Sequence, residues 1–242
     1  MKQIKQILSP VQNTQSIEHH NRFVFVDALR GFTVILMFVF HFTFDLDYFG
    51  LISLDMIRSP FWYFLPRLIV FLFLFAVGMG LFLAHYNKIK WKPFNKRLAL
   101  ITFWALIISI VTYKIFPDNW IYFGTLHSIA LVSIVTLLFL RHPRICLIVG
   151  LTLFLPSIFL DFNLPWIELP HASWDYISPF PWMGASLFGV FAAHKNLHKW
   201  VLPDTLAVKS LKYLGQHSLV IYLIHQPIFF GILYLVSKLI HY

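Results

Sequence analysis

The sequence predicts an all-α membrane protein, a bundle of about seven transmembrane helices. Of its 242 residues, 59% are hydrophobic and only 12% are charged, whereas soluble domains average about 25% charged residues. The mean hydropathy is +0.73. Apolar runs close to the roughly 20 residues that a spanning helix needs recur along the chain. Lipid is therefore the solvent that suits this surface.

Seven apolar runs reach or approach that length, and charges, prolines and tryptophans fill the connections between them. The sixth run is short, and its opening Ser178-Pro179-Phe180-Pro181-Trp182 predicts an extended segment at the membrane interface. No internal repeat stands out, so sequence symmetry does not support an inverted-repeat transporter. The runs cover residues 23–43, 62–86, 97–116, 122–140, 144–161, 179–194 and 215–239.

The first 21 residues are polar and lack the apolar core of a signal peptide. We expect residues 1–21 to form a flexible cytoplasmic tail and residues 22–242 to form a single transmembrane domain. Cys146 is the one cysteine, so no intrachain disulfide can form.

Charge distribution predicts the orientation, because cytoplasmic connections of membrane proteins are enriched in Lys and Arg. Alternate connections carry most of the 19 basic residues, and the opposite side carries most of the 10 acids. We therefore expect a multi-pass protein of the cell inner (cytoplasmic) membrane with its N-terminus inside. The net charge of +9 is explained by topology, and no nucleic-acid module is present. The basic side comprises Lys2, Lys5, Arg22, Lys88, Lys90, Lys92, Lys96, Arg97, Arg141, Arg144, Lys195, Lys199, Lys209 and Lys212.

The first run carries ionisable residues on one stripe. Arg30 and His41 are eleven residues apart, which is about three helical turns and about 16 Å along the axis. Asp27 precedes Arg30 by three residues, and Asp45 follows His41 by four. Because lipid solvates such groups poorly, this stripe should face the bundle interior or a wet cavity.

This stripe suits proton transfer at one end and anion binding at the other. His41 lies near the outer end, where Asp45 could hold one ring nitrogen and leave the other to take a proton from an acceptor hydroxyl or amine. Arg30 lies in the cytoplasmic half, where it could bind a phosphate or amide carbonyl, with Asp27 holding its guanidinium. The alternative is a structural Asp27–Arg30 ion pair and an interfacial His41 that reaches water.

The R-x10-H spacing of Arg30 and His41 resembles the first helix of the acyltransferase-3 membrane family. The longer pattern is similar to a related family, the bacterial branch that resembles the catalytic domain of heparan-α-glucosaminide N-acetyltransferase. The similarity extends from Arg22 to Pro227. It rests on the segments Asp27-Ala-Leu-Arg30-Gly31, Phe123-Gly124-Thr125-Leu126-His127-Ser128, Pro181-Trp182-Met183-Gly184, Leu214-Gly215-Gln216-His217-Ser218 and Tyr222-Leu223-Ile224-His225-Gln226-Pro227.

The resemblance implies transfer of an acetyl or other acyl group from cytosolic acyl-coenzyme A, a donor substrate such as acetyl-CoA, to a glycan or lipid-linked acceptor across the bilayer. It implies no permanently bound cofactor and no metal. The lysosomal enzyme has asparagine where this chain has His41, and its catalytic histidine lies in the following loop. Residues 42–61 of this chain contain no histidine. We therefore carry the histidine role from the R-x10-H family onto His41.

Further polar residues are candidates for lining the same cavity. His127 lies early in the fourth run, at about the depth of His41, with an interfacial structural role as the alternative. His225 and Gln226 lie within the seventh run, and Tyr222 shares the face of His225. Hydrogen bonding between helices would also explain His225. Arg67 begins the second run, as an interface anchor or as a ligand for an anionic acceptor.

Two alternatives from other classes stay open. Buried ionisable groups also mark a proton-coupled or small-solute transporter. Histidines on several helices could ligate a b-type haem, for which His41 and His127 are the pair at similar depth.

Residues 88–97 could hold coenzyme A phosphates, although the charge rule alone explains their lysines. Gly78 and Gly80 predict close helix packing. The acceptor and the oligomeric state are left open.

Overall fold

The computed structural model describes residues 24–55 and 58–240. The predicted tail, residues 1–21, and Arg22 lie outside the described residues. Within the described part, all regular structure is helical, with no strand. The all-α class is therefore confirmed. The α-helices are α2 (Val24–Tyr48), α3 (Pro60–His85), α4 (Trp91–Ile115), α5 (Thr125–Thr136), α6 (Pro143–Phe159), α7 (Pro179–His194), α8 (Leu206–Gln216) and α9 (Ser218–Ile240), and two 3-10 turns are η1 (Leu137–Phe139) and η2 (Leu197–Lys199).

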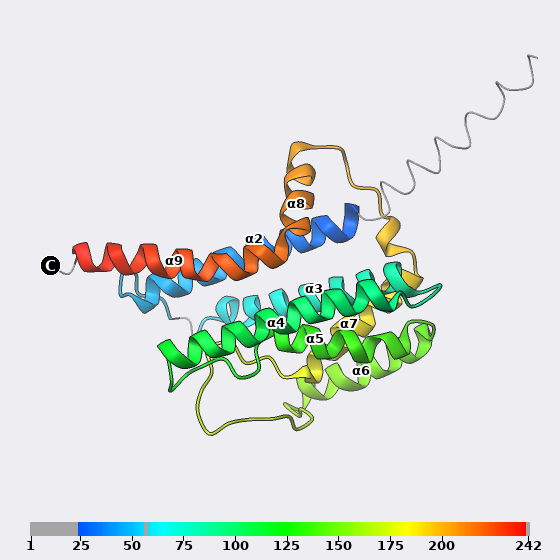
Figure 1. Cartoon of the computed structure of the whole chain (residues 1–242), viewed down its shortest axis with the longest axis horizontal. Coiled ribbons are helices and arrows are strands. Elements are labelled where there is room, and N and C mark those ends of the chain that lie inside the picture. The colour runs from blue at the N-terminus through cyan, green and yellow to red at the C-terminus, as the bar shows by residue number, and fades with distance from the viewer. Residues whose placement is uncertain (1–23, 56–57, 241–242) are drawn as a thin grey trace, which may run out of the picture.

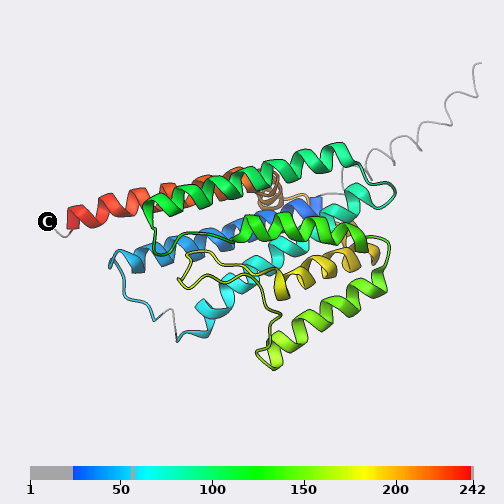
Figure 2. The same cartoon turned by 60° about the horizontal axis from the view of Figure 1, so that its bottom comes forward.

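The long helices run along one axis of the molecule, with α8 across them (Figure 1). α6 packs on α7 at one edge of the bundle (Figure 2). The α3–α4 and α5–α6 connections lie at the same end of the bundle (Figure 1). These connections carry Lys88, Lys90 and Arg141, and Arg144 lies in the first turn of α6, so one end of the bundle is strongly basic.

Each predicted apolar run coincides with a helix. Four helices, α2, α3, α4 and α9, are long and apolar enough to cross a membrane. The segment Thr125–Phe139 and α6 are shorter apolar helices, and α7 has 16 residues. The count of seven spans and the orientation stay predictions. Phe180 has an extended backbone, with φ −110° and ψ 131°, as predicted for the segment that opens α7.

The helix α8 was not predicted, because its 11 residues are too short to span a membrane and lie in a connection that its lysines mark as a loop. Its start did carry a signal, since the Thr205 side chain accepts a hydrogen bond from the amide of Val208 at 3.3 Å and so caps the helix. A Cβ atom on Gly31 would lie 1.9 Å from the carbonyl oxygen of Leu211. A Cβ atom on Gly215 would lie 1.8 Å from that of Asp27. Glycine at both positions therefore lets α8 cross α2 in backbone contact.

The helices α3 and α7 make the other close contact of the bundle. A Cβ atom on Gly78 would lie 1.8 Å from the carbonyl oxygen of Ser186, and one on Gly189 would lie 2.0 Å from that of Phe75. The predicted packing role of Gly78 is confirmed. Gly80 differs, because its missing side chain leaves room for the guanidinium of Arg30 instead of a helix backbone.

Candidate active site

The first part of the site is an ion pair near the start of α2. Arg30 Nη1 donates to Asp27 Oδ1 at 3.1 Å. The other carboxylate oxygen accepts from Gln216 Nε2 at 3.1 Å. The side chains of Arg30 and Asp27 are only 20% and 14% exposed, so the pair lies largely inside the protein. The predicted pairing is confirmed, and Gln216 of α8 is a partner that sequence patterns did not indicate.

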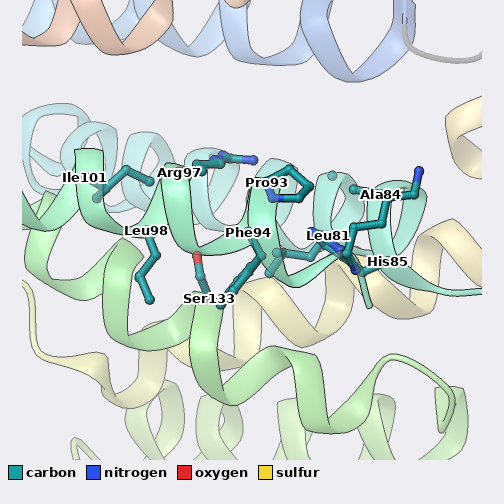
Figure 3. Close-up of a pocket in the computed structure, with 11 residues that line it drawn as sticks. Leu81, Ala84, His85, Pro93, Phe94, Arg97, Leu98, Ile101 and Ser133 are labelled. Carbon is teal, nitrogen blue, oxygen red and sulfur yellow. The ribbon is translucent and has the colours of Figure 1, made fainter. Parts of the chain in front are cut away.

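A cavity of about 380 Å³ lies between α3 and α4 beside this ion pair. Figure 3 shows Arg97 and Pro93 of α4, His85 of α3 and Ser133 of α5 around it. Lys90 also lines it, and so does Gly80, the residue against which the Arg30 guanidinium lies. The cationic groups of Arg97 and Arg30 are close enough to repel each other. A cavity with apolar walls and adjacent cations suits a ligand that joins an apolar part to anionic groups.

The second part of the site is a pair of histidines from two helices. The rings of His41 on α2 and His225 on α9 meet edge to face, with their centroids 4.9 Å apart. His225 is buried at 5% exposure. Its ring also contacts Phe38 and Phe229, with centroids 6.0 Å away in each case. The apolar rings therefore shield the pair from water on the His225 side.

Hydrogen bonding fixes which nitrogen of His225 carries the proton. Its Nδ1 lies 2.7 Å from the carbonyl oxygen of Tyr222. A carbonyl oxygen only accepts, so Nδ1 is the donor and carries hydrogen. The Nε2 atom of His225 is buried and has no hydrogen-bond partner among the described residues. In the neutral ring this atom is a bare acceptor.

Asp45 lies next to the pair but binds another residue. It is 1% exposed, and its two oxygens accept from Gln226 Nε2 at 2.8 and 3.1 Å. The predicted hydrogen bond from His41 to Asp45 is absent from residues 24–55 and 58–240. The reason is that α9 brings Gln226 against Asp45 and, one residue earlier in the chain, brings His225 against His41.

His127 is held by hydrogen bonds at both ring nitrogens. Its Nδ1 accepts from the amide of Gly124 at 3.1 Å, so Nε2 carries the hydrogen and donates to Ser109 Oγ at 3.2 Å. These bonds cap the start of α5 and tie it to α4. The structure therefore supports a structural role for His127. Because both of its ring nitrogens are hydrogen-bonded, neither is free to ligate a haem iron together with His41.

The side chains of two more predicted candidates, Arg67 and Tyr222, form hydrogen bonds with residues outside the histidine pair. The guanidinium of Arg67 is exposed, donates to the carbonyl oxygen of Tyr63 at 2.7 Å and lies 3.6 Å from the Tyr63 ring centroid, as an interface anchor would. The Tyr222 hydroxyl donates to Asp175 Oδ2 at 3.2 Å. No local sequence pattern marks Asp175 as a residue of this site.

Asp175 joins the connection before α7 to two helices. Besides the Tyr222 hydroxyl, its oxygens accept from the amide of Thr125 at 2.8 Å and from Thr125 Oγ1 at 3.1 Å. Burial raises the pKa of the Asp175 carboxyl, and the hydrogen bonds from Thr125 and Tyr222 oppose this only in part. The hydrogen bond to Asp175 holds Tyr222 of α9 in place, and with it the carbonyl oxygen that orients His225.

The raised pKa of Asp175 predicts a pH-dependent stability. The folded protein keeps the proton to a higher pH than the unfolded chain, whose aspartates have a pKa of about 3.9. The stabilisation that comes from the protonated Asp175 carboxyl is therefore fully present below about pH 4, and it is lost as pH rises through the pKa of this carboxyl in the folded protein. We expect wild type to lose thermal stability relative to Asp175→Asn as pH rises from about 4. Parallel melting profiles of the two proteins across this range would contradict the prediction.

A model of a known protein family matches most of the chain. The family model described as "Heparan-alpha-glucosaminide N-acetyltransferase, catalytic" matches residues 22–227. No curated protein and no solved structure matches the chain. Among the described residues, no group of three or more His, Cys, Asp or Glu side chains is placed to hold a metal ion.

Proposed function

Because the chain belongs to the family of heparan-alpha-glucosaminide N-acetyltransferase catalytic domains, we propose that it is an acyltransferase of the cell inner membrane. It moves an acetyl or other acyl group from cytosolic acyl-coenzyme A to a hydroxyl or amine of a glycan or lipid-linked acceptor at the outer face. The observation that supports this most is the cationic cavity beside Arg30, at the basic end of the bundle, with His41, the partner of His225 on α9, further along the helix of Arg30.

The cavity fits the donor. Coenzyme A joins a phosphorylated nucleotide to a slender arm with amide groups that ends in the acyl thioester. Lys90 and Arg97 line the cavity and would attract the phosphates. The cavity volume of about 380 Å³ suits the arm better than the whole cofactor, which leaves the nucleotide at the basic surface. Arg30 would donate to an amide carbonyl or phosphate oxygen of the arm.

The histidine pair lies where the arm would deliver the acyl group. Arg30 and His41 are about 16 Å apart along the helix axis. There, the acceptor oxygen or nitrogen attacks the thioester carbon while His41 takes its proton. The carbon–sulfur bond then breaks, the electron pair leaves with the thiolate of coenzyme A, and the proton on His41 returns to that sulfur. Atoms and charge balance without any further reactant.

In this proposal Asp45 does not hold a ring nitrogen of His41, which is the role that its sequence position predicts. Because it is bound to Gln226, it joins α2 to α9 and keeps His41 and His225 in register. Asp27 keeps the role expected for it, since it holds the guanidinium of Arg30.

Donor binding tests this function directly. We expect calorimetry on detergent-purified protein to show micromolar acetyl-coenzyme A binding, weakened about tenfold or more in Arg30→Ala and in Arg97→Ala, since each removes a charge-assisted hydrogen bond or attraction. Arg97 is exposed, so its truncation should not disturb folding.

Lys96→Ala is the matched control, because Lys96 is exposed on the same helix, carries the same charge and does not line the cavity. Its affinity should equal that of wild type. Equal losses in Lys96→Ala and Arg97→Ala would indicate a diffuse charge effect. Absence of binding by folded wild type would refute the acyltransferase proposal and favour a transporter with Arg30 and His41 in its solute path.

A further inference from the structure

His41 lacks the carboxylate partner that its sequence position predicts. Neither ring nitrogen of His41 has a hydrogen-bond partner among the described residues, and Asp45, the expected partner, is bound to Gln226. An imidazole that takes a proton in a mostly apolar setting gains a second N–H that needs an acceptor. Without one, the imidazolium would be costly to form.

His225 supplies that acceptor. Its Nδ1 is committed to the carbonyl oxygen of Tyr222, which leaves Nε2 unprotonated, buried and without a partner. The 4.9 Å between the two ring centroids is short enough for a ring nitrogen of each to reach the other by rotation of the rings. A buried acceptor without a partner is uncommon in proteins, because it has lost its hydrogen bonds to water without replacing them.

We propose that His225 is a positioning residue for the transfer step. Its Nε2 accepts the N–H of His41 when His41 has taken the proton from the acceptor. This inference rests on the proposed function, and it gives His225 the part that the carboxylate has in a Ser-His-Asp triad. The Tyr222 carbonyl oxygen sets the tautomer of His225, as the outer partner of a catalytic group commonly does.

The other charged and polar groups around the histidine pair are bonded to one another and do not occupy His225 Nε2. Asp45 and Gln226 bind each other, and Tyr222 donates its hydroxyl to Asp175. Besides His41, the rings that contact His225 are those of Tyr222, Phe38 and Phe229. Among the described residues, His41 is therefore the one polar side chain whose ring contacts His225 and has no other bond.

The test separates a positioning role from packing. In His225→Phe the aromatic ring is kept against Phe38 and Phe229, but the acceptor is lost. With acetyl-coenzyme A as donor and glucosamine and hydroxylamine as probe acceptors, release of the coenzyme A thiol reports turnover. We expect kcat to fall about 10- to 100-fold, as for other supporting residues, with KM for the acceptor and Kd for acetyl-coenzyme A unchanged. His225→Gln, whose amide oxygen can accept, should recover much of the loss.

His217→Phe is the matched control, because the Nδ1 of His217 also binds a backbone carbonyl oxygen, that of Tyr213, at 2.8 Å, but the residue is exposed. Its kcat should equal that of wild type. Unchanged kcat in His225→Phe, equal loss in His225→Phe and His225→Gln, or wild type that binds acetyl-coenzyme A but turns over neither probe would each overturn the inference. Wild type that fails to bind acetyl-coenzyme A would refute the proposed function instead.

A second measurement does not need turnover. In protein labelled with ¹⁵N-histidine, the spectrum should show His225 protonated at Nδ1. The ring signals of His41 should shift in His225→Phe and stay in place in His217→Phe. His41 signals that are unaffected by His225→Phe would overturn the inference, because the two rings would then not interact.

Discussion

Replacing His41 with alanine is expected to lower acyl transfer by about 100-fold or more, the range for removal of a residue that takes a proton in the reaction. The loss should appear in kcat, because the donor cavity lies beside Arg30 at the other end of the helix. His41 is part-buried and makes no hydrogen bond with a described residue, so its truncation removes few stabilising contacts. The measurement is release of the coenzyme A thiol from acetyl-coenzyme A with glucosamine as probe acceptor.

Two comparisons make this result interpretable. His142→Ala removes an exposed histidine at the other end of the bundle and should leave turnover unchanged. Binding of acetyl-coenzyme A by His41→Ala should match wild type in calorimetry. Wild-type turnover in a folded His41→Ala protein would exclude His41 as the proton acceptor, while loss of both binding and turnover would point to damage of the fold.

Replacing Gly78 with alanine is expected to cause a large loss of stability, because the added methyl group has no room between α3 and α7. The added Cβ would lie 1.8 Å from the carbonyl oxygen of Ser186 and 2.7 Å from its carbon. Both are backbone atoms, so α3 and α7 would have to move apart. Overpacking that forces the backbone to shift costs about 1–3 kcal/mol and occasionally more, and helices in membranes associate largely through such close contacts.

Gly231→Ala is the matched control for this change. Gly231 lies in α9, and a Cβ atom on it would meet nothing within 4 Å. Alanine there should be neutral or stabilise the helix by up to about 1 kcal/mol. Thermal melting in detergent, followed by size-exclusion chromatography, should show Gly78→Ala shifted to low temperature and Gly231→Ala unshifted. Equal melting temperatures for both variants would mean that α3 and α7 are packed less closely than described here.

The local properties of the chain followed from the sequence. Long apolar runs have to form helices, because backbone groups in an apolar environment need hydrogen bonds within their own segment. The Asp27–Arg30 pair was also predictable, since residues three apart on a helix are neighbours. The family resemblance, carried by short motifs from residue 22 to 227, agrees with the family model. The helices of the apolar runs and the family of the chain could therefore be predicted from the sequence alone, whereas α8 could not.

Only the tertiary structure decided which side chains meet. Gln226 reaches Asp45 across 181 residues, and Asp175 reaches Thr125 across 50; helical periodicity describes one helix at a time and holds no record of its neighbours. The amphipathic helix α8 likewise gained its place from two glycines that let it contact the backbone of α2. His41 and His225 form a pair for the same reason, because the packing of α9 on α2, and not the spacing of residues along either helix, sets the distance between their rings.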